Sequence, residues 1–166
     1  MDGHTHVIHS FQPVFDSNSR ILILGSLPSV KSRETGFYYG HPQNRFWRLV
    51  ALLTKNEVPN DITQKTELLK KCGIALYDVI AECDIIGSSD SSIKNAVPAD
   101  LSPIFSAADI RKVYANGAAS ARLYRKFQQK LTGRDITVLP STSPANAAWN
   151  MDRLAQTWKI ILDDLL

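Results

Sequence analysis

A cluster of aromatic side chains and one amide lie close together in the sequence. Phe37, Tyr38 and Tyr39 are followed five positions later by Asn44. Aromatic faces can stack on a flat ring, and a carboxamide can hydrogen-bond to water or to a polar ring edge. Because Phe37 and Tyr39 alternate around Tyr38, an extended segment would point them to the same side. These residue types predict a pocket for a flat, polar ligand, although aromatic residues also pack cores for their buried area alone.

The residues before this cluster predict the strand that positions it. Positions 21–24 are Ile-Leu-Ile-Leu, an apolar run that is typical of a strand covered on both faces of a parallel sheet. The run leads into a loop that begins with Gly25, Ser26, Leu27 and Pro28. Open α/β sheets bind ligands at the carboxyl ends of their strands. We therefore expect this loop and the aromatic residues to share one crevice, followed by a helix from about Asn44 to Thr54.

Strand and helix patterns alternate along the rest of the chain. Further strands are predicted at Ile74–Ile80, Val113–Ala115 and Ile136–Leu139, and helices at residues 61–69, Leu101–Ala108, Ala118–Leu131 and Met151–Leu166. This alternation predicts a parallel sheet with helices on both faces. The expected fold class is α/β, with three α/β/α layers around a central four-stranded, mainly parallel sheet. The 166 residues suit a single domain, residues 1–166, because no linker or repeat divides them.

The composition excludes several classes of protein. The formal net charge is only +3, so a nucleic-acid partner would have to be bound by local groups of Lys and Arg. The two cysteines, Cys72 and Cys83, fit neither a CxxC metal site nor a disulfide-rich scaffold, and they are too few for an iron–sulfur cluster. No apolar run is long enough to cross a membrane, and no signal-type hydrophobic core begins the chain. We expect a cytoplasmic protein with no metal and no cofactor.

Two separated motifs resemble those of one enzyme superfamily. Residues 25–29 read GSLPS and residues 36–47 read GFYYGHPQNRFW, which together are similar to the first signature of the uracil-DNA glycosylase superfamily. Residues 141–146 read STSPAN after a predicted strand and are similar to the second signature loop. The motifs cover about a quarter of the chain, but they occur in the superfamily's order and at nearly full-length separation. The GSxPS form is most similar to the hypoxanthine-DNA (deoxyinosine) glycosylase branch.

The resemblance implies a monofunctional DNA glycosylase that hydrolyses the N-glycosidic bond of a deaminated base, with hypoxanthine as the leading candidate. Its partner would be double-stranded DNA containing deaminated bases, and it would act as a monomer. Such an enzyme rotates the nucleotide out of the duplex before it breaks the bond. By resemblance, the base pocket would be formed by Gly25, Ser26, Leu27, Pro28, Phe37, Tyr39 and Ser141. The DNA contacts would come from Lys31, Ser143, Pro144, Ala145 and Asn146.

The sequence departs from the superfamily's pattern at two positions. Leu27 stands where mismatch-specific relatives have a water-positioning Asn, and Ser141 stands where other branches have His or Asn. Asn44 is the alternative catalytic residue, because its amide carbonyl can hold and orient a water molecule. Capping is the competing interpretation, since Asn is among the best N-caps and Asn44 directly precedes the predicted helix. The two replacements leave open a uracil or mismatch-specific glycosylase and a non-catalytic binder of damaged nucleic acid.

Two further groups of residues have less specific patterns. His4, His6 and His9 have a spacing that could bind a metal, but we expect them to be solvated side chains at a frayed terminus. A basic face on one predicted helix is formed by Arg122, Arg125, Lys126 and Lys130. We expect it to be an ordinary exposed face, which would contact DNA only if it lay beside the carboxyl edge of the sheet.

Overall fold

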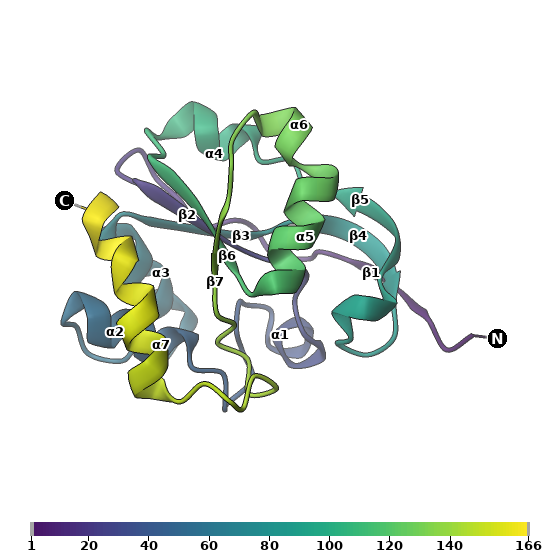
Figure 1. Cartoon of the computed structure of the whole chain (residues 1–166), viewed down its shortest axis with the longest axis horizontal. Helices are drawn as coiled ribbons and strands as arrows, with labels where there is room; N and C mark the ends of the chain where they lie inside the picture. Colours follow the sequence, from purple (N-terminus) through teal and green to yellow (C-terminus); the bar gives the residue numbers. More distant parts are fainter. Residues whose placement is uncertain (1, 166) are drawn as a thin grey trace.

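A four-stranded parallel sheet with helices on both faces forms the centre of the molecule (Figure 1). The computed structural model describes residues 2–165. The strand order is β3 (Ile74–Asp78), β2 (Ile21–Gly25), β6 (Lys112–Asn116) and β7 (Thr137–Leu139). One face is covered by α2 (Phe46–Thr54), α3 (Ile62–Cys72) and α7 (Met151–Trp158), and the other by α4 (Ser102–Ala107) and α5 (Ala118–Phe127). The predicted three-layer α/β/α fold is confirmed.

Strand β2 is paired on both edges and buried on both faces, because it lies between β3 and β6. Ile21 and Ile23 pack in the core under α2, α3 and α7, while Leu22 and Leu24 pack in the core under α4 and α5. All four side chains are 0% exposed. Burial contributes about 1.5–3 kcal/mol for each of them. The strand therefore gives the loop at its carboxyl end a fixed support.

A second, antiparallel sheet was not expected from the sequence. It contains β1 (Thr5–Ile8), β4 (Ile80–Ile85) and β5 (Lys94–Pro98), in the order β1-β4-β5. The single strand predicted at Ile74–Ile80 is wrong, because the chain leaves the parallel sheet after Asp78 and continues as β4. The apolar pattern continues across this break without a glycine or proline, so hydrophobicity alone does not reveal it.

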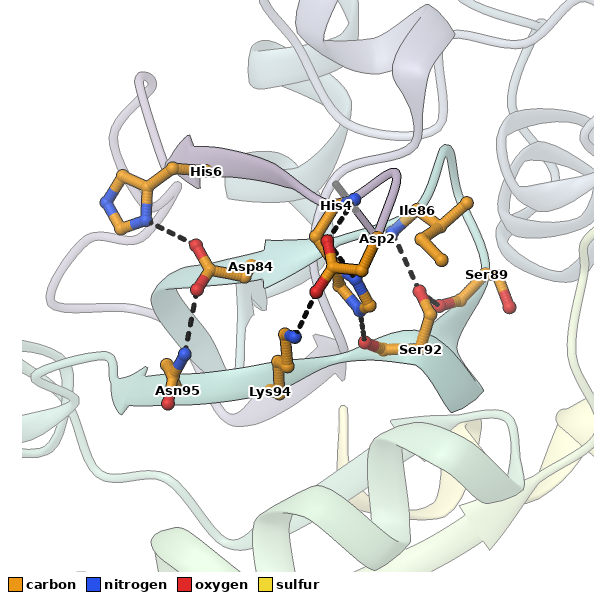
Figure 2. Close-up of polar contacts among 9 residues, drawn as sticks. All are labelled: Asp2, His4, His6, Asp84, Ile86, Ser89, Ser92, Lys94 and Asn95. Carbon is orange, nitrogen blue, oxygen red and sulfur yellow. Dashed lines mark hydrogen bonds and ion pairs between the residues drawn. The ribbon is translucent and has the colours of Figure 1, made fainter.

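The N-terminal segment is paired along β1 and is not frayed, contrary to the expectation from its position. Figure 2 shows His6 against Asp84 of β4, which also accepts a hydrogen bond from Asn95 of β5. His4 Nε2 donates to the Ser92 carbonyl at 2.8 Å (Figure 2). Within residues 2–165, no group of three or more His, Cys, Asp or Glu side chains is arranged to hold a metal ion.

Three helices differ from the sequence expectation. A short helix, α1 (Val30–Thr35), lies in the expected loop; Ser29 caps its first turn, and Gly36 ends it with a left-handed φ of 75°. The predicted helix at Ala118–Leu131 is divided into α5 and α6 (Gln129–Thr132). The predicted final helix ends as α7 at Trp158 and continues as a 3-10 helix at Lys159–Asp164, while Leu166 lies outside the described residues. None of the helices within residues 2–165 is both long and apolar enough to span a membrane.

Candidate active site

A cavity of about 150 Å³ lies at the carboxyl ends of the central strands. The four parallel strands contribute Gly25, Asp78 and Asn116 at their last residues and Ser141 just beyond β7. The other lining residues are Ser26, Leu27, Pro28, Ser29, Ser32, Tyr38, Tyr39, Asn44, Ser88, Asp90, Thr142 and Ser143. Both sequence motifs therefore meet in one cavity, although residues 48–140 of the chain lie between them.

Gly25 allows two polar side chains to approach the end of β2 closely. A Cβ atom at position 25 would overlap Asp78 Oδ1 and would lie 3.1 Å from Tyr39 Oη. The close approach, and not a positive φ, is what requires glycine here. Val79 N donates to Gly25 O at 2.8 Å, and Ile80 N donates to Ser26 O at 3.1 Å. These bonds hold the first loop against the junction of β3 and β4.

Thr142 joins the two motif loops through hydrogen bonds. Its hydroxyl donates to Asn44 Oδ1 at 2.9 Å and accepts from Asn116 Nδ2 at 3.0 Å. Its backbone N–H donates to Asn116 Oδ1 at 3.0 Å. Thr142 itself is 0% exposed, and its two partners line the cavity beside it. Hydrogen bonds that link three side chains in this way fix the relative positions of the groups they connect.

Arg45 holds the second loop by its backbone carbonyls. Its guanidinium donates to the carbonyls of Ser143 at 2.9 Å, Asn146 at 3.2 Å and Trp149. Its backbone N–H donates to Thr142 O at 3.1 Å. The planar guanidinium has five donors in a fixed arrangement, which suits several acceptors on one loop. Neighbouring residues of the first motif, Asn44 and Arg45, thus both contact the second motif.

The amide of Asn44 is oriented by two donors. Its Oδ1 accepts from Phe46 N at 2.9 Å, at the start of α2, and from the Thr142 hydroxyl at 2.9 Å. A carbonyl oxygen has two lone pairs, so both are occupied. The N-cap position of α2 is Arg45 and not Asn44, but Asn44, one residue earlier, still accepts from the first N–H of the helix. The carbonyl expected to hold water is already engaged. The other polar group of Asn44, a residue that lines the cavity, is the NH2 of its amide at Nδ2, which is a hydrogen-bond donor.

Phe37 and Tyr39 do not lie on the same side, because their segment is a turn and not an extended strand. Tyr39 lines the cavity, has a positive φ of 51°, and packs its ring 4.3 Å from that of Phe46. Phe37 does not line the cavity; its ring is stacked on Trp47 at 5.9 Å, with the two planes 15° apart. The aromatic residues of this segment that line the cavity are Tyr38 and Tyr39.

Asp78 is a buried carboxylate that the sequence interpretation missed. It is 3% exposed, and its Oδ2 lies 2.7 Å from His9 Nε2, whose side chain is 1% exposed. Its other oxygen, Oδ1, faces the end of β2 at Gly25. The Tyr39 hydroxyl is also buried and makes no hydrogen bond within residues 2–165. Burial and the charge of Asp78 raise the pKa of Tyr39, opposed by the Asn116 side chain, so Tyr39 keeps its proton.

Asp90 is a second cavity carboxyl group that was missed. It begins the 3-10 helix at Asp90–Ser92, and its Oδ1 accepts from the Ser26 hydroxyl at 2.6 Å. Burial, together with the negative charge of Asp78, raises the pKa of Asp90, while the Ser26 hydrogen bond and Arg122 oppose the rise. The signal for Asp78 was a polar residue at the end of an apolar strand. No local signal marks Asp90, because its loop reads as a polar surface segment.

The residues expected to contact DNA are divided between the cavity and its surroundings. Ser143 lines the cavity, and its Oγ accepts from Ala145 N at 3.2 Å. Ala145 is exposed, whereas Asn146 donates its side-chain amide to Ser141 O at 3.0 Å. Pro144 lies between them and is half-buried.

The basic residues lie outside the cavity. Lys31 is exposed on α1 and lies 3.6 Å from Glu34, so it is not among the lining residues. Arg122, Arg125, Lys126 and Lys130 are exposed. The charge of Arg122 opposes the rise in the pKa of Asp90, but none of the four residues lines the cavity.

A parallel α/β/α sheet with a polar cavity at its carboxyl edge, closed by two loops that are far apart in the sequence, defines an α/β protein with its ligand site where the strands end. The chain belongs to the uracil DNA glycosylase superfamily, whose family model matches residues 12–165.

Two relatives are named hypoxanthine DNA glycosylase. The protein from Methanosarcina acetivorans is 34% identical over 152 residues, which span 91% of this chain and 95% of the relative. The protein from Methanosarcina barkeri is 34% identical over 143 residues, which span 82% of this chain and 86% of the relative. A solution NMR structure from M. acetivorans, described as a candidate uracil DNA glycosylase, superimposes with a TM-score of 0.78. It has 34% sequence identity, over 93% of this chain and 96% of the other.

Proposed function

We propose that this protein is a monofunctional DNA glycosylase that removes hypoxanthine from deoxyinosine in double-stranded DNA by hydrolysing the N-glycosidic bond. The observation that carries the proposal is the cavity in which Thr142 joins the two motif loops. A cavity lined by backbone, aromatic and polar groups at this edge suits a flat base rotated out of the duplex. The names of the two relatives support hypoxanthine as that base.

The polar groups of the cavity are complementary to a lactam edge. Asp78 Oδ1 is an acceptor, and the Tyr39 hydroxyl is a donor without a partner in residues 2–165. Deamination of adenine creates a ring N–H beside a carbonyl, which needs one acceptor and one donor. Adenine has a ring nitrogen lone pair at the same position, which would face the carboxylate oxygen of Asp78. An unpaired polar contact of this kind disfavours the wrong base strongly.

Asn44 is proposed to assist departure of the base through the NH2 group of its side-chain amide. Breaking the C1′–N bond places positive charge on the sugar and negative charge on the base, and a donor fixed before the reaction stabilises the latter. Thr142 and Phe46 N hold the Asn44 carbonyl, which directs Nδ2 away from them. Asn44 therefore serves as both cap and catalytic residue in this proposal.

The remaining site residues support the reaction. Gly25, Ser26, Leu27, Pro28 and Ser141 form the pocket wall, Tyr39 or Tyr38 supplies the stacking surface, and Phe37 supports them from the core. Ser143, Pro144, Ala145 and Asn146 contact the DNA backbone next to the extruded nucleotide, and Lys31 contributes from α1. Within residues 2–165, the residues that line the cavity include no lysine, and the proposed reaction therefore has no Schiff base with the sugar. We further propose that residues 1–166 act as one domain and as a monomer, in a reducing compartment where Cys72 and Cys83 stay unpaired.

Labelled duplexes that contain hypoxanthine, uracil, xanthine or an undamaged base test the proposal. After incubation and heating in alkali, strand scission is expected with the hypoxanthine duplex. Scission of the uracil duplex alone would assign the protein to uracil repair instead. Salt-sensitive binding without scission of any duplex would identify a non-catalytic binder.

Two substitutions separate the catalytic contribution of Asn44 from its capping contribution. Asn44→Asp keeps an oxygen that accepts from Phe46 N and Thr142, but it replaces the NH2 of the amide by a carboxylate oxygen. We expect unfolding free energy within about 1 kcal/mol of the unsubstituted protein and excision slowed by at least about a hundredfold. Asn44→Ala removes both contributions and should also lose about 1–2 kcal/mol of stability. Undiminished excision by Asn44→Asp would contradict a catalytic role for the NH2 group of the Asn44 amide.

A further inference from the structure

The loop that carries Asp90 is held from several sides. Ser92 Oγ accepts from Ile86 N at 2.8 Å and donates to Ser89 O at 2.6 Å, as Figure 2 shows. The Ser92 carbonyl receives the His4 contact from the N-terminal sheet (Figure 2). Two residues of α1 also donate hydrogen bonds to this loop. Val30 N donates to Ser88 Oγ at 2.9 Å, and Arg33 Nη2 donates to Gly87 O at 3.0 Å. Hydrogen bonds from the N-terminal sheet and from α1 therefore hold the turn that carries Asp90 in place.

Only one oxygen of Asp90 is engaged. Oδ1 accepts from Ser26 Oγ, and within residues 2–165 no hydrogen bond is made to Oδ2. Ser26 and Asp90 both line the cavity, so the carboxyl group is held at its wall. A carboxyl group fixed at one oxygen and open at the other has the arrangement of a proton donor.

Burial raises the pKa of the Asp90 carboxyl group, and the negative charge of Asp78 adds to this rise. Asp78 on β3 is the second carboxyl group of the cavity, and its charge opposes ionisation of Asp90. Two carboxyl groups in one site are commonly divided into an ionised and a protonated member. The nearby cation is Arg122 on α5, which is exposed to solvent and acts weakly. Tyr39 and the Cys83 thiol of β4 are the other titratable groups that interact with Asp90.

Arg33 of α1 completes the set of charged groups around this turn. It acts on Cys83 and donates to the Gly87 carbonyl. His9 Nε2 lies 2.7 Å from Asp78 Oδ2, so this histidine contacts the second carboxyl group of the cavity.

We propose that Asp90 is the general acid that protonates the departing purine. This inference rests on the proposed glycosylase function. As the C1′–N9 bond breaks, its electron pair passes to the purine, and the Asp90 proton is transferred to a purine nitrogen. Hypoxanthine leaves as a neutral base, and Asp90 becomes a carboxylate. Water then bonds to C1′ and loses a proton, which restores the acid, so that the sum is hydrolysis. General acid catalysis of this kind contributes about 10²–10⁴-fold to the rate.

The pH dependence of the chemical step is the decisive measurement. Since the protonated form is the active one, the rate should fall as pH rises through the pKa of Asp90. Asp90→Asn keeps an oxygen for the Ser26 hydroxyl but carries no acidic proton. We expect single-turnover excision of hypoxanthine to be at least about a hundredfold slower, without this descending limb. Ser26→Ala removes a hydrogen bond that favours the carboxylate form of Asp90. The pKa of Asp90 should therefore rise, and the fall in rate with pH should occur at higher pH.

The outcomes separate this inference from the proposed function. If the unsubstituted protein releases no hypoxanthine, the proposed function fails. If it releases hypoxanthine and Asp90→Asn gives an equal rate, or a slower rate with an unchanged pH profile, Asp90 is not the acid. Circular dichroism establishes whether Asp90→Asn is folded. Should it be unfolded, the direction of the shift in Ser26→Ala decides, and an unmoved limb overturns the assignment.

Discussion

Substitution of Thr142 by Val tests the connection between the two motif loops most directly. Valine has nearly the same shape, so it fills the same buried space but has no hydroxyl. It removes the donor to Asn44 Oδ1 and the acceptor of Asn116 Nδ2, while the Thr142 backbone N–H keeps its bond to Asn116 Oδ1. The substitution thus affects the orientation of Asn44 without creating a cavity.

The size of the effect follows from these two bonds. Leaving the Asn116 amide NH2 without its acceptor costs about 1–3 kcal/mol of unfolding free energy. Asn44 keeps only the contact to Phe46 N, so its amide can turn away from the cavity. We expect the chemical step to slow by at least about tenfold, which corresponds to about 1.4 kcal/mol of lost transition-state stabilisation.

Thr142→Ser is the matched control. It keeps the hydroxyl and loses one buried methyl group, which costs about 0.8 kcal/mol of stability. Urea denaturation should therefore show a loss for both variants, whereas single-turnover excision of hypoxanthine should slow for Thr142→Val alone. Equal excision rates for the two variants would refute the argument, because the hydroxyl would then have no part in orienting Asn44.

Three other substitutions are predicted from close contacts in the site. Gly25→Ala should reduce excision by at least about tenfold and cost about 1–3 kcal/mol of stability, because the new Cβ overlaps Asp78 Oδ1; urea unfolding and scission assays measure both. Arg45→Lys cannot span the carbonyls of the second loop and should raise the Kd for deoxyinosine duplex at least about tenfold, with exposed Arg48→Lys as the unaffected control. Asp78→Asn should lower the ratio of the inhibition constants for free adenine and free hypoxanthine by about tenfold or more, because Asp78 accepts from the ring N–H of hypoxanthine in the proposal; an unchanged ratio would contradict recognition of the lactam edge by Asp78.

The central fold could be predicted from the sequence because its signals are local. The unbroken apolar run of β2 showed burial on both faces, and the loop after it was expected at the ligand-binding edge of the sheet. The alternation of strands and helices was sufficient for the three layers. The N-terminal sheet was missed because its strands are short and partly exposed, with residues such as His6 and Lys94 that carry no apolar period.

The sequence by itself determined the two motif segments of the cavity, since Gly25, Asn44 and Ser141 all belong to motifs that can be read along the chain, whereas the segments that carry Asp78 and Asp90 were not predicted to be part of it. Only the tertiary structure decided what those segments present to a ligand. The contact of Thr142 with Asn44 spans 98 positions, and that of Ser26 with Asp90 spans 64. Hydrogen-bond partners and charge environments depend on distances in space, so a linear pattern does not specify the orientation of an amide or the protonation of a carboxyl group.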